Sequence, residues 1–463
     1  ELRTEGVRYR QPANSYLFIL NLAQRDRKVI WHPFTSQKSM IDPLAIVKGK
    51  GAELTDENGN SYIDAISSWW VTLHGHGHPY IAEKIYTQAK TLEQVIFAGF
   101  THEPAIVLAE RLLPLLPGNF SKIFYSDNGS TSTEVAIKMA LQYWWNKNEP
   151  GSREPQENSQ KPYSRSSEPG TMLKARTKIL AFNNSYHGDT FGAMSISDRS
   201  VFTLAFYDKL FEVIFIDAPL TDDCALPSIE WNEIACFIYE PLLQGAGGMK
   251  LYSSSGLNSL LQQCKEHKII CIADEVMTGF GRTGKFFASE FCEVKPDIIC
   301  LSKGLTGGTM ALGVTACTQH IYDAFVSNNK LKTFFHGHSF TANPIACTAA
   351  VASLDLLKQE ECIRSIEFIT KENNLFHDLL LKNKERLQLK NIRGLGTILV
   401  VEVDNGATEY LNNIGSIITQ KALAKGVYLR PLGNTLYVMP PYCITPTQLN
   451  KVYQVILEIL EEL

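Results

Sequence analysis

The sequence predicts an α/β protein with a mostly parallel central sheet. Short apolar runs rich in Ile and Val recur from about residue 120, and stretches with helical periodicity separate them. Runs of this length are typical of strands that are buried on both faces of a sheet, and their alternation with helices favours parallel pairing. The predicted strands of this sheet are 122–126, 178–182, 235–239, 269–273, 297–301 and 313–318.

The other predicted elements belong to a smaller α+β domain and to the helices that cover the sheet. Residues 52–65 alternate around Asn58-Gly59, which is a strong signal for a β-hairpin. After about residue 345 the sequence returns to helices and short strands, with strands predicted at 397–403 and 435–439. The clearest predicted helices are 131–147, 255–267, 343–358 and 448–462.

These elements predict two domains, the smaller of which is formed by both ends of the chain. We expect a large domain over 81–345 and a small domain made of 27–80 and 346–463. Residues 1–26 are interpreted as an N-terminal extension, because they lack the apolar region of a signal peptide. Residues 149–170 are polar and rich in Pro, Ser and Glu, and they predict a disordered or surface-loop insertion.

Composition and charge exclude several classes of protein. The 463 residues include 44 Lys and Arg against 48 Asp and Glu, a net charge of −4 without the basic surface that nucleic acids require. No apolar run approaches the roughly 20 residues that span a bilayer, and nothing indicates a membrane partner. The 10 cysteines form no CxxC pair and no zinc-ligand pattern, so we expect a reduced, cytoplasmic protein without a metal site.

A glycine-rich loop at 279–284 offers one possible function. Its sequence GFGRTG matches the GxGxxG pattern of dinucleotide-binding proteins. In a Walker A loop, Phe286 would stand where Ser or Thr must hold magnesium, and no helix is predicted behind the glycines. The pattern therefore favours a tight turn near an active site, and a nucleotide-dependent enzyme stays as an alternative.

Two charged side chains follow neighbouring predicted strands. Asp274 comes directly after the run 269–273, and Lys303 follows 297–301 and precedes several glycines. The carboxyl ends of parallel strands form the ligand-binding edge of an α/β sheet. An acid and a desolvated lysine at this edge suit pyridoxal phosphate, since the lysine can bond to the cofactor and the acid can keep its ring nitrogen protonated. Taken alone, Asp274 could be a carboxylate that caps a helix or forms a salt bridge, and Lys303 could be a surface lysine.

Two further segments fit the same cofactor. Gly129 and Ser130 lie between a strand and a helix whose predicted start is a capping box of Thr131 and Glu134, and free N–H groups there would bind a phosphate. In 184–190, Tyr186 could stack on a planar ring, and Gly188 permits a close backbone approach. His187 could be a satisfied structural histidine.

Together these residues resemble the class III, fold-type I pyridoxal-phosphate aminotransferases, from about residue 28 to the end of the chain. The order of the motifs and the 29-residue step from Asp274 to Lys303 fit that family. The motifs are WHPFT (31–35), SSWW (67–70), YHGDTFGAM (186–194), QGAGG (244–248), DE (274–275), GFGRTG (279–284), KGLTGG (303–308) and RP (430–431). The resemblance implies the fold of that family, with a large cofactor-binding domain.

The resemblance also implies roles for the residues around the cofactor. Lys303 would bind pyridoxal phosphate covalently and then move a proton, and Asp274 would pair with the ring nitrogen. Gly129 and Ser130 would bind the phosphate, while Tyr186 would cover the ring and face the substrate. Gln244 would reach the ring hydroxyl. The loop Gly337-His338-Ser339 would reach the phosphate and substrate of a neighbouring subunit, which implies a homodimer with shared active sites.

The substrate site is implied in the same way. Arg430 resembles the arginine that takes the carboxylate of the amino acceptor, a task that suits a guanidinium. Trp69 and Asp189 stand where the family shapes the pocket and senses the acceptor's amino group. Phe34 replaces a tyrosine that contacts substrate in some members, and His338-Ser339 replaces Pro-Thr.

Within the family, the motifs are most similar to members that aminate 8-amino-7-oxononanoate with S-adenosylmethionine during biotin biosynthesis. The Trp69-Trp70 pair favours adenosylmethionine as the amino donor, whereas His338-Ser339 is nearer to enzymes that use lysine. Three alternatives remain: lysine as donor, a family member acting on ornithine, 4-aminobutyrate or another ω-amino acid, and a racemase or decarboxylase of the same fold.

Overall fold

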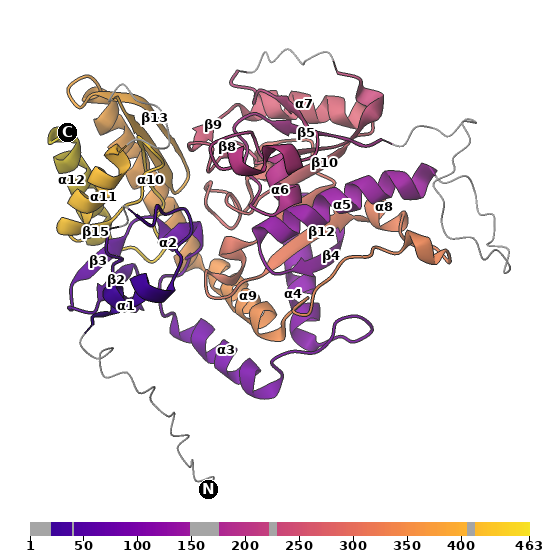
Figure 1. Ribbon diagram of the computed structural model, residues 1–463, viewed down its shortest axis with the longest axis horizontal. Helices are drawn as coiled ribbons and strands as arrows, with labels where there is room; N and C mark the ends of the chain where they lie inside the picture. The colour runs from indigo at the N-terminus through magenta and orange to yellow at the C-terminus, as the bar shows by residue number, and fades with distance from the viewer. Residues whose placement is uncertain (1–19, 39–40, 149–175, 222–228, 405–412) are drawn as a thin grey trace, which may run out of the picture.

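The computed structural model describes residues 20–38, 41–148, 176–221, 229–404 and 413–463 (Figure 1). Its largest sheet has seven strands in the order β4-β12-β11-β10-β7-β5-β6. The six predicted strands are confirmed, with shifts of two residues at most, and only the short edge strand β6 of this sheet was not predicted. The strands are β4 Phe120–Ser126, β5 Lys178–Phe182, β6 Ile214–Ile216, β7 Ile234–Tyr239, β10 Ile270–Asp274, β11 Ile298–Leu301 and β12 Gly313–Thr318.

The strand directions place one set of ends at a single edge of the sheet. Neighbouring strands from β6 to β11 are parallel, and β12 is antiparallel to both β11 and β4. All strands except β12 therefore run in the same direction, as the predicted mostly parallel sheet requires. The loops that follow β4, β5, β7, β10 and β11 all leave from this shared edge.

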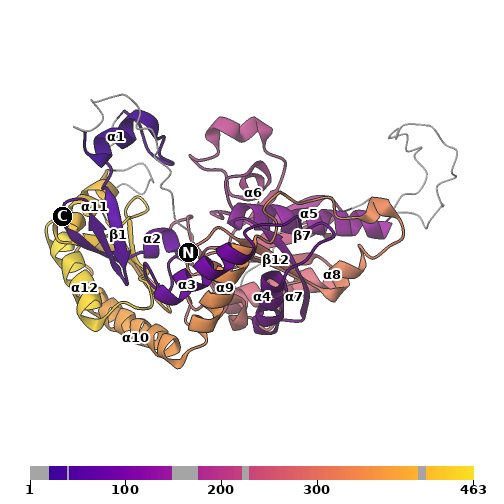
Figure 2. The same ribbon diagram turned by 90° about the horizontal axis from the view of Figure 1, so that it is seen from below.

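Helices cover both faces of the sheet, which explains why its central strands are buried and largely apolar on both faces. Helix α5 (Gly129–Asn148) packs on one face, with Cys236 and Ile238 of β7 in the same cluster. Helix α7 (Ser254–Glu266) lies on the other, where Phe237 and Tyr239 point. Figure 2 shows these two helices on opposite sides of the sheet. Successive side chains of a strand point to opposite faces, so each needs an apolar partner.

The remaining sheets join segments that are far apart in the sequence. The predicted hairpin is present as β2 and β3, and β15 from the C-terminal region pairs in parallel with β3. In Figure 1 the indigo strands β2 and β3 and the yellow C-terminal helices accordingly lie together. The four-stranded sheet contains β1 Ile46–Lys50, β2 Glu53–Asp56, β3 Ser61–Asp64 and β15 Val427–Tyr428, and a three-stranded sheet contains β13 Leu389–Leu395, β14 Ile398–Val403 and β16 Thr435–Val438. The domain limits at 80 and 345 stay predictions.

A two-stranded hairpin and the other helices complete the fold. The hairpin pairs β8 (Leu243–Gln244) with β9 (Lys250–Leu251). The helices are α1 Leu22–Val29, α2 Ser67–Trp70, α3 Pro79–Thr91, α4 Glu103–Leu112, α6 Phe191–Ile196, α8 Gln319–Asp323, α9 Pro344–Leu357, α10 Glu360–Lys382, α11 Ile414–Ala424 and α12 Pro446–Glu461. No helix of the described ranges is long and apolar enough to cross a membrane. The predicted insertion at 149–170 and residues 1–19 of the extension lie outside the described residues.

Candidate active site

An inner cavity of about 660 Å³ lies at the shared edge of the large sheet. Lys303, Asp274 and Tyr186 line it together with the loop that carries Gly129 and Ser130. The structure therefore brings together five of the residues that the sequence predicted for one site.

Lys303 follows β11 in a strained backbone conformation. Its φ of 43° is left-handed, which is uncommon for a residue other than glycine and is typical of functional sites. The Nζ atom lies 4.9 Å from the centre of the Trp70 ring. Desolvation lowers the pKa of Lys303 below its usual value, and Asp274 and Glu240 raise it in part. An amine held in this way loses its proton more readily than a surface lysine.

Asp274 is the last residue of β10 and is only 5% exposed. Its Oδ2 lies 2.7 Å from Nδ1 of His187, and its Oδ1 accepts the N–H of Val276 at 3.1 Å. The His187 side chain is buried, and its Nε2 has no hydrogen-bond partner among the described residues. The sequence left His187 undecided, and the structure connects it to the acid of the site.

Helix α5 begins at Gly129, two residues earlier than predicted. The predicted capping box of Thr131 and Glu134 is wrong, because the side chain of Asn128 instead accepts the N–H of Thr131 at 2.9 Å. Within the described ranges, no acceptor is recorded for the N–H groups of Gly129 and Ser130. A Cβ on Gly129 would lie 2.8 Å from Val276, so this end of the helix is closely packed. It can bind an anion.

Glu134 has a different task from the predicted cap. Its Oε1 accepts the hydroxyl of Thr190 at 2.6 Å and the N–H groups of Gly192 at 2.7 Å and Ala193 at 3.2 Å. Because Gly192 and Ala193 lie in the first turn of α6, Glu134 caps that helix. The carboxylate thus joins α5 to the turn that carries Tyr186.

Tyr186 and Asp189 form one wall of the inner cavity. The Tyr186 hydroxyl donates to Oδ2 of Asp189 at 2.8 Å. Burial and the Asp189 carboxylate both raise the pKa of Tyr186, so the phenol keeps its proton. The backbone at Gly188, with a φ of +133°, passes so close to Ser130 that a Cβ would lie 2.2 Å from Ser130 Oγ. The close approach expected at Gly188 is therefore made to Ser130.

Glu240 is a functional candidate that sequence reasoning missed. This buried residue lines the inner cavity, and its two oxygens accept the N–H groups of Tyr186 at 3.0 Å and Gly245 at 2.8 Å. Its pKa is raised to about 7, mainly by burial and in part by Asp274, while His187 acts in the opposite direction. Its position directly after β7, at the same edge as Asp274 and Lys303, was the signal that could have found it.

Gln244 is not brought into the inner cavity. Its Nε2 donates to the carbonyl of Asn183 at 2.7 Å, and the side chain is buried. Gln244 thereby holds the start of the turn that carries Tyr186. It is absent from the described residues that line the inner cavity.

Trp69 and Trp70 lie in a strained turn. Ser67, Ser68 and Trp70 all have positive φ, and Asp64 holds the turn by accepting the N–H of Ser68 at 2.6 Å. Such strain persists only where surrounding contacts enforce it and is frequent at active sites. Here it places Trp70 beside Lys303 and leaves Trp69 facing outward, 37% exposed.

Two of the remaining predicted substrate residues, Arg430 and Phe34, lie beside Trp69. The Arg430 guanidinium lies 4.5 Å from the Trp69 ring centre, and the Phe34 ring packs edge-on at 5.6 Å. By contrast, the loop Gly337-His338-Ser339 lines neither this cluster nor the inner cavity. The carbonyl of Ser339 instead accepts from the side chain of Gln94, at the surface.

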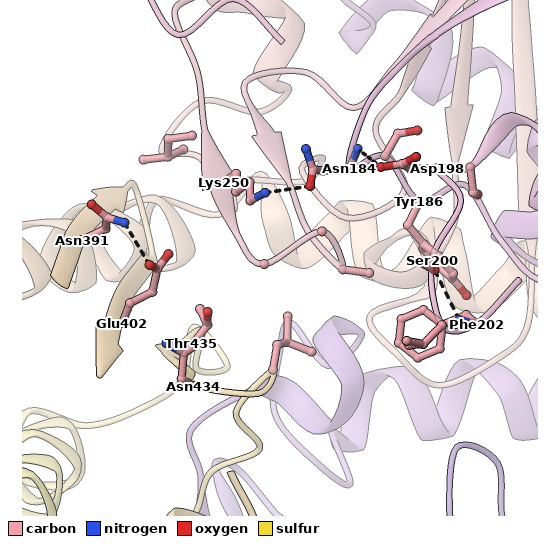
Figure 3. Close-up of a pocket in the computed structure, with 18 of the residues that line it drawn as sticks. Asn184, Tyr186, Asp198, Ser200, Phe202, Lys250, Asn391, Glu402, Asn434 and Thr435 are labelled. Atoms are coloured by element: carbon pink, nitrogen blue, oxygen red, sulfur yellow. Dashed lines mark hydrogen bonds between the residues drawn. The ribbon is translucent and has the colours of Figure 1, made fainter. Parts of the chain in front are cut away.

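An outer cavity of about 1160 Å³ adjoins the inner one and shares Tyr186, Gly188, Asp189 and Ala246 with it. Figure 3 shows Lys250 pointing to Asn184 on one side, where the Nζ to Oδ1 distance is 2.7 Å. The opposite side carries Asn391, Glu402, Asn434 and Thr435 from the C-terminal region. The glycine loop 279–284 lines neither cavity.

Comparison with known proteins places the chain in a family. The model of the Aminotransferase class-III family matches residues 34–460. An adenosylmethionine-8-amino-7-oxononanoate aminotransferase from Synechococcus elongatus is 45% identical over 448 residues, covering 94% of this chain and 99% of the relative. The enzyme of the same name from Helicobacter pylori is 36% identical, covering 96% and 98%. The crystal structure of another from Methanocaldococcus jannaschii superimposes with a TM-score of 0.84 at 34% identity, covering 95% and 98%. This chain belongs to the class-III aminotransferases.

Proposed function

We propose that the chain aminates 8-amino-7-oxononanoate to 7,8-diaminononanoate in biotin biosynthesis, with S-adenosylmethionine as amino donor and pyridoxal phosphate as cofactor. The observation that carries the chemistry is the meeting of Lys303, Asp274 and the free end of α5 in one cavity. The names of relatives with 35–45% identity over almost their whole length support the substrates.

The residues of the inner cavity fit pyridoxal phosphate. The unsatisfied N–H groups at the start of α5 suit the phosphate, and the buried Asp274 carboxylate suits the ring nitrogen. When bound, the cofactor supplies an electron sink for the negative charge that develops on the substrate carbon. Gly129 and Ser130 would hold the phosphate, Tyr186 would cover the ring, and Lys303 would bond to the cofactor.

In this proposal Lys303 transfers the proton, and other side chains hold the groups of the site in position. Lys303 Nζ takes the proton from the donor carbon that bears the amine, and it returns a proton to the ketone carbon of the acceptor. The burial that lowers the pKa of Lys303 favours the uncharged amine that this task needs. His187 fixes the orientation of the Asp274 carboxylate through their 2.7 Å contact. Gln244 supports the Tyr186 turn.

The substrate is held farther from Lys303. We propose that Asp189 receives the amino group of the acceptor, because this residue lines both cavities and its carboxylate is held by the Tyr186 hydroxyl. Arg430 takes the acceptor's carboxylate beside Trp69 and Phe34, where the guanidinium stacks on an indole. A guanidinium binds a carboxylate through two parallel hydrogen bonds.

The functional unit in this proposal is a cytoplasmic homodimer. Ile96, Phe100, Phe335 and Phe340 are each more than 60% exposed, and hydrogen bonds from Asn343 connect the two loops that carry them. An apolar surface of this kind is typical of a protein interface. A second copy docked there would receive the loop Gly337-His338-Ser339 at its own phosphate site.

Replacing Lys303 tests the proposed chemistry. We expect Lys303→Ala to lower the rate of amine transfer at least about a thousandfold, since the variant loses its proton carrier. Lys382→Ala, at the exposed end of α10, is the matched control and should keep full activity. The rate is measured as formation of the diamine, with circular dichroism to verify folding. Normal turnover by a folded Lys303→Ala variant would contradict the assignment.

A further inference from the structure

Ser130 contacts the substrate wall as well as the predicted phosphate site. Its Oγ accepts the backbone N–H of Asp189 at 3.2 Å. The absence of a Cβ at Gly188 allows this contact, because a Cβ there would lie 2.6 Å from the Cβ of Ser130. The second residue of α5 is therefore bonded to the residue that faces the acceptor.

The Ser130 hydroxyl can form hydrogen bonds with Asp189 and with a phosphate at the same time. A serine hydroxyl offers one O–H donor and two acceptor lone pairs. One lone pair of Ser130 Oγ is used by Asp189, and the O–H proton remains available to an anion at the free end of α5. Donation to an anion polarises the hydroxyl, which then accepts the Asp189 N–H more strongly.

Asp189 in turn has few other anchors. Its side chain is exposed and bonds to the Tyr186 hydroxyl at 2.8 Å. Its neighbour Thr190 is held by Glu134 at 2.6 Å. Among the described residues, the hydrogen bond to Ser130 Oγ connects the backbone N–H of Asp189 to the predicted phosphate site. Loss of that bond would let the Asp189 carboxylate move relative to Lys303.

We propose that Ser130 is a positioning residue for Asp189, so that an occupied phosphate site orders the wall that binds the acceptor's amino group. The inference rests on the proposed function for the identity of the acceptor. The Ser130 hydroxyl then affects both the affinity for the cofactor and the affinity for the acceptor, and the two effects can be measured separately.

The first test is hydrogen exchange of the Asp189 amide. In the wild-type protein, saturation with pyridoxal phosphate should slow exchange at Asp189 at least about tenfold. In Ser130→Ala, saturation should leave that amide fast while the Gly192 amide, held by Glu134, stays protected. Ser130→Cys, which fills the same space with a weak acceptor, should behave like Ser130→Ala. Equal protection of Asp189 in wild type and both variants would overturn the proposal.

The second test separates acceptor binding from cofactor binding. With saturating pyridoxal phosphate, Ser130→Ala should raise the KM for 8-amino-7-oxononanoate about tenfold and change the KM for the donor less than about twofold. Ser132→Ala is the matched control, because its hydroxyl bonds to the Gly129 carbonyl within the same helix. A wild-type acceptor KM in cofactor-saturated Ser130→Ala would overturn the proposal. A wild-type protein that forms no diamine defeats the proposed function instead, and the exchange result still decides the role of Ser130.

Discussion

Glu240 is a buried carboxyl group that the motifs did not single out. It joins the turn at Tyr186 to the hairpin at Gly245 by accepting one N–H from each. Burial is the main cause that raises its pKa to about 7, while His187 lowers the pKa and Asp274 raises it. The folded protein therefore holds a proton on Glu240 that the unfolded chain, with a pKa near 4.5, releases earlier.

This difference predicts how stability depends on pH. The contribution of Glu240 to the free energy of unfolding is fully present below pH 4.5 and is lost as the pH rises through about 7. We expect a loss on the order of 3 kcal/mol from this group over that range. In Glu240→Gln this part of the pH dependence should vanish. Urea unfolding at several pH values between about 5 and 8 measures it, and parallel curves for the two proteins would contradict the assignment.

The functional residues at the strand ends could be predicted from the sequence, whereas the side chains that they contact could not. Asp274 and Lys303 could be found because each directly follows a buried run at the edge where parallel strands end. The contact between His187 and Asp274 joins residues 87 positions apart and depends on how two loops pack. Glu240 also follows a buried strand directly, but no motif near it in the sequence indicated a function.

At the scale of elements, α5 organises the site. Its first residues form the proposed phosphate site, and Glu134 caps α6 beyond the Tyr186 turn. A Cβ on Gly192 would lie only 2.1 Å from Oε2 of Glu134, so the two elements fit together without spare room. Helix α5 thus fixes both the anion site and the wall opposite Lys303.

The contact between α5 and α6 can be measured with a double-mutant cycle. Gly192→Ala should lower the free energy of unfolding by about 2 kcal/mol, because the added methyl group overlaps the Glu134 carboxylate. In a Glu134→Ala background the same change should cost less than about half as much, since the overlapping group is gone. Thermal or urea unfolding of the four proteins gives the coupling. Strictly additive effects would show that the two side chains do not interact.

The elements themselves were largely predictable from the sequence. The central strands of the large sheet are apolar on both faces, and apolar runs give the limits of the six predicted strands within two residues. The start of α5 was misplaced because Thr131 and Glu134 have the spacing of a capping box, while Asn128 makes the cap and Glu134 bonds to α6. The strained turn at Ser67–Trp70 had no local signal, because contacts such as that of Asp64 enforce it.

At the scale of the whole molecule, the site lies where segments from both ends of the chain meet the large sheet. Arg393 of β13 donates to the carbonyls of Gly248 and Met249, each at 2.6 Å, and pairs with Glu402 at 2.7 Å. This partly buried guanidinium connects the C-terminal region to the β8–β9 hairpin. Arg430 and Trp69 lie together outside the inner cavity, where we propose that the acceptor's carboxylate binds.

One assay measures directly which donor and which acceptor exchange the amine. The cofactor-loaded protein is incubated with 8-amino-7-oxononanoate and either S-adenosylmethionine or lysine, and 7,8-diaminononanoate is quantified by mass spectrometry. We predict that the diamine forms with adenosylmethionine, in step with consumption of that donor, and does not form with lysine. No diamine in the adenosylmethionine reaction, or diamine in the lysine reaction alone, would contradict the account.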